Sequence, residues 1–335
     1  MSRLSAQRPP RTLPRRSWQR DRRAAVRVFL AGATGAIGRP LVRMLVADGH
    51  QVTGMTRSAG KAAALRAAGV EPVVVDALDA PAVTRALAAA QPEVVINQLT
   101  AIPPRLDPRK IARDFALTDR LRTEGTRILI DAAHAAGARR MIAQSIVLVY
   151  APGPPGTVHT ESDPVNVNPH KSYRQTGGAL VELERQVLAA GGQVLRYGYF
   201  YGPGSAISRT GSLGVEVARR RLPIVGGGTG VWSFIHVEDA ARATVAILAK
   251  ETSGAYNVVD DEPANVAEWL PALADALGAP RPLRVPSLLA RPLAGGYGIE
   301  TMTRAQGASN ARAKRELGWR PSFPSWRDGF RNGLG

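Results

Sequence analysis

The pattern of apolar and polar positions at the start of the folded chain predicts a strand, a turn, a helix and a second strand. Residues 26–30 (VRVFL) form a short, mostly apolar run, as in a buried parallel strand. Glycines recur at every third position within residues 32–38, and apolar residues then recur at helical spacing over residues 40–48. Residues 52–55 resume as a strand. This order of elements is half of a mononucleotide-binding unit.

The alternation of strand and helix patterns continues along the chain and predicts the fold class. Further apolar runs suited to parallel strands stand at residues 72–75, 93–97, 141–150 and 193–197. The long helical pattern that starts near residue 112 is interrupted near Gly125 and Thr126. We therefore expect an α/β protein with a doubly wound, Rossmann-type parallel sheet and a smaller C-terminal substrate lobe. The predicted parts are a disordered basic tail (1–24), a nucleotide-binding domain (25–200 and 229–252) and a substrate-binding lobe (201–228 and 253–335).

Three glycines after the first strand have separate physical roles. Their spacing is G-x-x-G-x-x-G, and one permits a tight turn, one lets backbone approach a pyrophosphate, and one lets the helix pack closely on the strand. The helix N-terminus adds free N–H groups and the positive end of the helix dipole. The residues that we predict to hold a dinucleotide here are Gly32, Thr34, Gly35, Ala36, Ile37 and Gly38.

This glycine spacing resembles that of the extended short-chain dehydrogenase/reductase family, in its NAD(P)-dependent epimerase/dehydratase group. The run LRYGYFYGPG (195–204) is similar to the family's turn into the substrate lobe, and GASNARAKRELGW (307–319) is similar to its C-terminal helix. The resemblance implies a nicotinamide cofactor and a small-molecule substrate. The resemblance does not decide whether the protein forms a homodimer.

The end of the second strand predicts which cofactor is preferred. An NAD site typically has an acidic residue there, which accepts a hydrogen bond from the ribose 2′-hydroxyl. This chain has Thr56 and Arg57 instead, and no acidic residue occurs between Asp48 and Glu71. Arg57 could pair with a 2′-phosphate, which favours NADP over NAD. The alternatives are that Arg57 is a solvated surface residue and that NAD is used.

The ends of the third and fourth strands supply the remaining predicted cofactor contacts. By the resemblance, Asp76 and Ala77 lie beside the adenine ring; the alternative is that Asp76 caps the helix at residues 80–90. Gln98, Leu99 and Thr100 follow the fourth strand, and ligands of open parallel sheets bind outside such carboxyl ends.

The catalytic residues of the family are altered in this chain. The family has two adjacent small hydroxyl residues in the fifth strand, the second of which usually hydrogen-bonds the substrate. It also has a Tyr-x-x-x-Lys pair, in which the Lys lowers the Tyr pKa. Here the usual hydroxyl position is Ile146, with Ser145 one residue earlier, and Tyr173 is followed four residues later by Gly177. Tyr173 and Ser145 are our catalytic candidates, and Lys171 could reach the site from its loop. The alternative is that Tyr173 only lines the pocket.

Tyr199 stands where the family commonly has a substrate-facing Asn, so we expect it either to face substrate or to pack in the core. A more aromatic site argues against the sugar nucleotides that the family usually binds. We therefore expect a different, more hydrophobic oxygenated metabolite.

Composition excludes several other classes of protein. The net charge of +17 suggests nucleic acid, but much of it comes from the Arg-rich tail, and no basic stripe with interleaved aromatic residues follows, so we expect no specific nucleic-acid binding. There is no cysteine and no ligand spacing of His and carboxylates, so we expect no metal. No apolar run is long enough to span a membrane, and no secretory signal core is present, which predicts a cytoplasmic protein.

These observations predict an NAD(P)-dependent oxidoreductase or isomerase that acts on a small carbonyl or hydroxyl metabolite other than a sugar nucleotide. The broken Tyr/Lys pair supports an alternative from another class. In that alternative the protein binds the cofactor without net redox catalysis, as a sensor or as a cyclisation or elimination enzyme.

Overall fold

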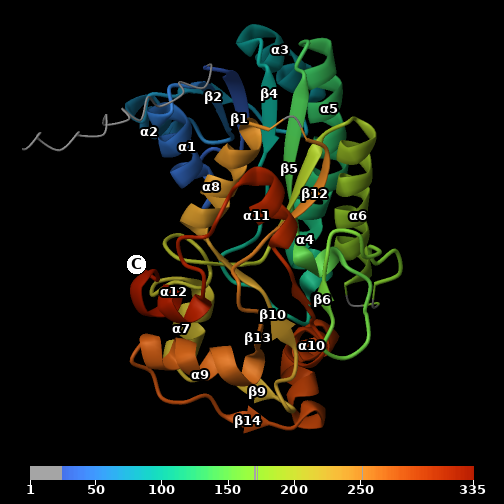
Figure 1. Cartoon of the computed structure of the whole chain (residues 1–335), viewed down its shortest axis with the longest axis vertical. Helices are drawn as coiled ribbons and strands as arrows, with labels where there is room; N and C mark the ends of the chain where they lie inside the picture. The colour runs from blue at the N-terminus through green and yellow to red at the C-terminus, as the bar shows by residue number, and fades with distance from the viewer. Residues whose placement is uncertain (1–24, 170, 172, 251) are drawn as a thin grey trace, which may run out of the picture.

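The computed structural model describes residues 25–335 apart from 170, 172 and 251, so the predicted tail (1–24) lies outside the described residues. Within the described part, seven parallel strands form one sheet in the order β12-β7-β5-β4-β1-β2-β3 (Figure 1). The chain winds outward from β1 in one direction and then outward from β4 in the other, which confirms the predicted doubly wound α/β fold. The sheet strands are β1 (Arg27–Ala31), β2 (Gln51–Thr56), β3 (Glu71–Val74), β4 (Val94–Asn97), β5 (Arg140–Ile146), β7 (Gln193–Tyr197) and β12 (Gly254–Val258).

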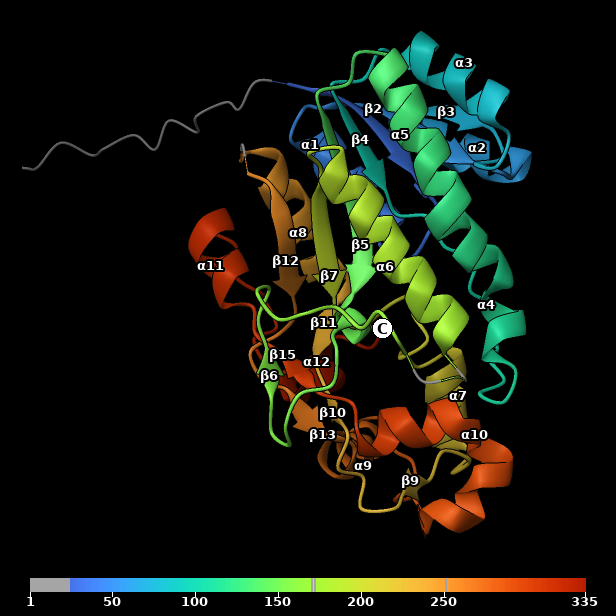
Figure 2. The same cartoon turned by 90° about the vertical axis from the view of Figure 1, so that its right-hand side faces the viewer.

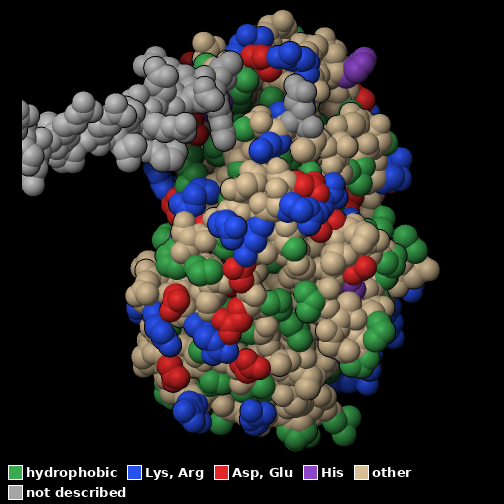
Figure 3. Space-filling view, in the orientation of Figure 1, with side chains coloured by type: hydrophobic (Ala, Val, Ile, Leu, Met, Phe, Trp, Pro, Cys, Tyr) green, Lys and Arg blue, Asp and Glu red, His purple; other side chains and the backbone are tan. Residues whose placement is uncertain are grey.

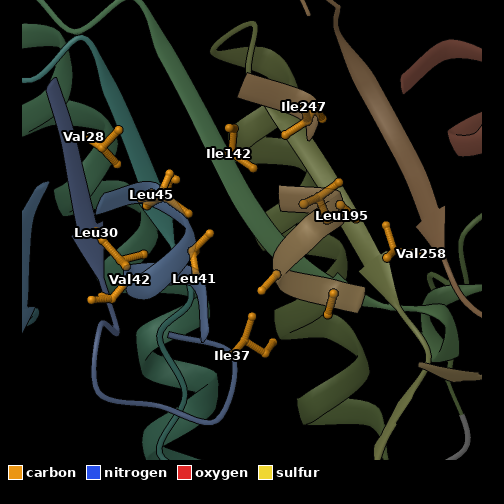
Figure 4. Packing of buried hydrophobic residues seen from close by; sticks show 14 of the residues in the cluster. Val28, Leu30, Ile37, Leu41, Val42, Leu45, Ile142, Leu195, Ile247 and Val258 are labelled. Carbon is orange, nitrogen blue, oxygen red and sulfur yellow. The ribbon is translucent and has the colours of Figure 1, made fainter. Parts of the chain in front are cut away.

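Helices cover both faces of this sheet because its strands are apolar on both faces. Val28 and Leu30 of β1 pack toward one layer, while Phe29 and Ala31 pack toward the other. Figure 4 shows the first of these clusters, where Leu41 of α1 and Ile247 of α8 meet the sheet. Each fully buried side chain of this size contributes roughly 1.5–3 kcal/mol. The flanking helices are α1 (Gly38–Ala47), α2 (Ala59–Ala67) and α8 (Val237–Leu248) on one side and α3 (Ala80–Ala90), α5 (Thr126–Ala135) and α6 (Arg174–Ala189) on the other.

The predicted interruption of the long helix is confirmed, and it takes the form of a π-helical turn. α4 (Ile111–Arg120) passes into α5 through the turn Leu121–Gly125. Thr126 lies at the junction, where its Oγ1 donates to the carbonyl of Leu121 at 3.4 Å and accepts from Asn97 Nδ2 at 3.2 Å. Such a turn changes which side chains face inward, and π-turns are frequent at functional sites.

The smaller lobe is built around its own aromatic core. Trp269, Trp326 and Phe330 are fully buried there, and Tyr201 packs edge-on against Phe330. Figure 2 shows the lobe, with α10 lying below the N-terminal end of α6. The remaining elements are β6 (Val158–His159), β8 (Tyr199–Tyr201), α7 (Ser212–Ala218), β9 (Ile224–Val225), β10 (Val231–Trp232), β11 (Phe234–His236), β13 (Ala264–Asn265), α9 (Val266–Ala276), β14 (Arg284–Val285), α10 (Ser287–Thr303), β15 (Gly307–Ala308), α11 (Ala311–Leu317) and α12 (Trp326–Asn332).

The range predicted for the lobe includes segments that pack on the sheet. β12, which starts at Gly254, is the edge strand beside β7, and α11 covers it. Trp319, just after α11, is buried in the same cluster as β1. The predicted boundary at residue 253 therefore needs correction, because the apolar residues of β12 and α11 complete the core of the larger domain.

A buried ion pair fixes α6 to the sheet. Arg196 of β7 donates to Glu184 of α6, with Nη2–Oε2 at 2.6 Å and Nε–Oε1 at 3.0 Å, and both side chains are 4% exposed. Arg196 Nη1 also donates to the hydroxyl of Tyr150 at 2.9 Å, which in turn donates to Asn257 Oδ1 at 2.7 Å. This network joins α6, β7 and β12, and it thereby fixes α6 against the sheet.

Removing one charge of this pair should destabilise the protein strongly. Glu184→Gln leaves Arg196 buried without its counter-ion, which should lower the free energy of unfolding by about 3–5 kcal/mol in urea titrations. Glu182→Gln, which breaks the exposed pair with Arg185 on the same helix, should cost about 0–1 kcal/mol. Equal effects of the two variants would contradict this role of the buried pair.

Candidate active site

The glycine loop between β1 and α1 has the geometry of a pyrophosphate cradle. Gly32 has a φ of +92°, and a Cβ there would stand 2.6 Å from the backbone oxygen of Gln98. Only glycine fits this conformation and this approach without strain. No side chain caps the start of α1, so its N-terminal end remains available to an anion. The residues present therefore fit the dinucleotide that the sequence predicts.

The other predicted cofactor residues stand in a row along the carboxyl ends of β2, β3 and β4, because these strands run parallel to β1 in the same sheet. Thr56 ends β2, and the exposed Arg57 follows it directly. Gln98 is buried behind the glycine loop, where its Nε2 donates to the hydroxyl of Tyr197 at 3.2 Å. Leu99 and Thr100 follow at the surface of the same edge.

Asp76 and Ala77 come just after β3, and the proposed capping role of Asp76 is wrong. The N-cap of α3 is Asp79, whose Oδ1 accepts from the backbone N–H of Ala82 at 3.0 Å. Asp76 instead accepts from the backbone N–H of Leu78 at 3.0 Å. Its alternative place, beside an adenine ring, remains a prediction.

A cavity of about 100 Å³ lies between the carboxyl end of β5 and α10. Aromatic side chains form two of its walls: Tyr173 stacks on Tyr297 with ring centroids 5.2 Å apart, and Tyr150 stacks on His159 at 4.6 Å. His159 is held by hydrogen bonds of 3.1 Å to Asp163 and to Gln306. These walls suit a flat aromatic group.

Tyr173 lies at this cavity, immediately before α6, and the family's lysine is missing four residues later. The exposed Lys171 lines a second hollow together with Tyr173. Gly177, four residues later, is buried, and a Cβ there would stand 2.6 Å from Cγ of Pro169. The packing therefore leaves no room for the family's lysine. Burial and the nearby Tyr297 hydroxyl raise the pKa of Tyr173 well above its usual range, so its phenol is neutral near pH 7.

The other two predicted site residues, Ser145 and Tyr199, have different surroundings from Tyr173. Ser145 of β5 is 1% exposed and does not line the cavity of Tyr173. Tyr199 stacks on Trp232 with centroids 3.7 Å apart, and burial together with Tyr297 and Tyr173 raises the pKa of its phenol. Neither Tyr199 nor Ser145 lines the cavity beside Tyr173.

Sequence reasoning missed three residues of this site. Tyr297 lies on α10 beyond a kink at Gly295, whose φ of +60° and close approach to Pro108 turn the chain toward Tyr173. Arg122 and Asp119 are buried beside the π-turn, and the only signal in the sequence was the predicted break in the helix. No local pattern indicated Tyr297.

The surface and the helices give little support to other classes of partner. On the face shown in Figure 3, Lys and Arg side chains are interspersed with Asp and Glu. Among the described residues, no helix has both the length and the apolar character needed to cross a membrane.

Together, the cradle, the polar strand ends and the cavity under a second lobe define an enzyme of the nucleotide-dependent Rossmann class. Comparison with known proteins identifies that class: residues 28–259 match the NAD dependent epimerase/dehydratase family, and the chain belongs to it. The chain is an NAD(P)-dependent oxidoreductase with a nicotinamide cofactor, acting on a small metabolite.

Individual relatives agree with this assignment. Over 309 residues, covering 91% of this chain and 99% of the relative, the chain is 48% identical to a 3-diazoavenalumate denitrifying reductase of Streptomyces sp. Its fold is similar to that of a UDP-glucose 4-epimerase with UDP-glucose from Thermotoga maritima (TM-score 0.73, 21% identity, 92% and 97% of the two chains). It is also similar to a human epimerase family protein with NADPH (TM-score 0.70, 21% identity, 92% and 98%).

The neutral state of Tyr173 can be measured. Because burial raises its pKa, the ultraviolet difference spectrum between the parent and Tyr173→Phe should show no tyrosinate signal up to about pH 10, the ordinary value for tyrosine. In urea, where the protein is unfolded, that signal should appear near about pH 10. A signal that titrates below about pH 9 in the folded protein and is absent from Tyr173→Phe would show a lowered pKa instead.

Proposed function

We propose that the protein is an NADPH-dependent reductase that removes nitrogen from an aromatic diazo compound. The observation that carries the proposal is the packing of Gly177 on Pro169, which leaves Tyr173 without the lysine that would stand four residues later in the family's motif. The 48% identity to a denitrifying reductase supports the same reaction. A proton shuttle matters for carbonyl reduction, because that reaction creates an alkoxide that must be protonated.

The proposed reaction needs no such shuttle. When hydride replaces N2 on an arenediazonium ion, the C–N bond breaks and its electron pair leaves with N2. The hydride pair becomes the new C–H bond, and no proton is taken up or released. A lysine at position 177 would also place a cation beside a cationic substrate, which electrostatics disfavours. The altered motif therefore fits this substrate better than it fits a carbonyl.

The residues around the cofactor and the cavity have distinct proposed roles. The loop from Gly32 to Gly38 would hold the pyrophosphate, and the adjacent strand ends from Gln98 to Thr100 would face the nicotinamide half. When bound, NADPH supplies the hydride. The aromatic walls at Tyr173 and Tyr150 would hold the substrate ring flat, and the lobe above them would exclude water. Arg57, exposed after β2, would select NADPH through its 2′-phosphate.

The reaction itself can be tested with 4-carboxybenzenediazonium as the substrate. We expect NADPH oxidation, followed by its near-ultraviolet absorbance, with release of an equal amount of N2, at a rate well above that of a mixture containing heat-unfolded protein. Tyr173→Phe should keep kcat within about tenfold, because no proton is transferred.

Two results would contradict the proposal. One is oxidation of NADPH by aromatic ketones but not by the diazonium. The other is a loss of about 10²–10⁴-fold in kcat for Tyr173→Phe, the usual worth of a proton donor.

Cofactor preference can be tested separately by calorimetry. Arg57→Ala should weaken NADPH binding by about 1–3 kcal/mol, the range for a hydrogen bond to a charged group, and should leave NADH binding nearly unchanged. Lys61→Ala, an exposed cation in the neighbouring α2, is a matched control. Equal affinity of the parent for both cofactors would argue against NADP specificity.

A further inference from the structure

One wall of the cavity is a single face of α10. Side chains of this helix and of its C-cap residue line the cavity: Tyr297, Glu300, Thr301 and Arg304. Their spacing of three, four and seven residues from the first puts them on the same side of a helix. The wall therefore has an aromatic ring at one end and a guanidinium at the other, about 10 Å apart along the helix axis.

The guanidinium at the end of this wall has no counter-ion from the protein. Arg304 is exposed, and its side chain makes neither an ion pair nor a hydrogen bond within the described part of the chain. Glu300 stands four residues earlier, the spacing at which Arg312 and Glu316 form an ion pair elsewhere in the chain. Arg304 is not paired in that way, so its charge is available to a ligand in the cavity.

The chain just after Arg304 is held in place by side-chain hydrogen bonds. Gln306 Nε2 donates to the carbonyl of Gly153 at 2.9 Å, and Gln306 Oε1 accepts from the backbone N–H of Gly153 at 2.7 Å. The same oxygen lies 3.1 Å from Nε2 of His159, whose Nδ1 lies 3.1 Å from Asp163 Oδ2. Gln306 and His159 therefore have protein partners, whereas Arg304, which lines the same cavity, is left to pair with something else.

We propose that Arg304 is a specificity-determining residue that binds a carboxylate on the flat aromatic substrate. The planar guanidinium matches a carboxylate in a bidentate pair, while the stacked Tyr173 and Tyr297 hold the ring. Glu300, one turn earlier on the same face, repels such a group and keeps it at the Arg304 end of the cavity. The inference rests on the proposed function for the reacting group, and it adds a second functional group to the substrate.

Two pairs of probes test for the carboxylate: benzoate with benzamide, and cinnamate with cinnamamide, whose polar group reaches further from the ring. Their binding would be measured by equilibrium dialysis with saturating NADP⁺, which fills the cofactor cradle so that no probe binds there. We expect at least one acid to bind about 5–20-fold more tightly than its amide. That range lies between the usual worth of an exposed ion pair and that of a hydrogen bond to a charged group.

Variants then assign the preference for the acid to Arg304. Arg304→Gln should abolish the preference, and Arg304→Lys should keep part of it, because the charge stays but the planar fork is lost. Arg291→Gln is the matched control, because Arg291 is exposed on the same helix but does not line the cavity, and it should keep all of the preference. Glu300→Gln should not reduce it. Equal binding within both probe pairs, or a preference that survives Arg304→Gln, would overturn the proposal.

A measurement on the parent protein covers the case in which Arg304→Gln does not fold, as judged by circular dichroism. Because the Arg304 side chain is exposed, its attraction for a carboxylate should be screened, and the preference should shrink in 1 M KCl. A preference that 1 M KCl leaves unchanged would overturn the proposal. These measurements involve no turnover, so a failure of diazo reduction would leave their outcome intact, and the two proposals can fail separately.

Discussion

The close packing of Gly177 on Pro169 is the constraint on which the character of this site depends. One turn into α6, the chain has no room for a side chain, so the helix cannot carry the family's lysine at position 177. Tyr173 is left as a half-buried, neutral phenol. The arginine that lines the cavity is Arg304, at the end of α10. Under the proposed function, the site binds and orients its substrate and transfers no proton.

Three structural features bring these distant residues together. The Arg196–Glu184 pair fixes α6 on the sheet, the π-turn directs Arg122 inward, and the kink at Gly295 brings Tyr297 against Tyr173. Each breaks a local preference: a charge is buried, a helix is underwound or a backbone is bent. Such departures are expected where a fold serves a site rather than stability alone.

The sequence predicted the cofactor half of the molecule much better than the substrate half. The strand, glycine turn and helix at residues 26–48 are local, so their pattern is complete in the sequence. The capping of α3 was misplaced by three residues, because Asp76 and Asp79 are equally suitable by type and only geometry separates them. Arg304 and Tyr297 could not be predicted, because their place at the cavity arises from the tertiary contacts of α10. The sheet edge at β12 was assigned to the lobe for the same reason.

The central claim is that this site delivers hydride without a coupled proton. The most direct measurement is the number of protons taken up per NADPH oxidised, followed in a pH-stat while the released N2 is collected from the diazonium substrate. This account predicts N2 release with no proton uptake. Uptake of one proton per hydride, as the reduction of a carbonyl requires, would contradict it.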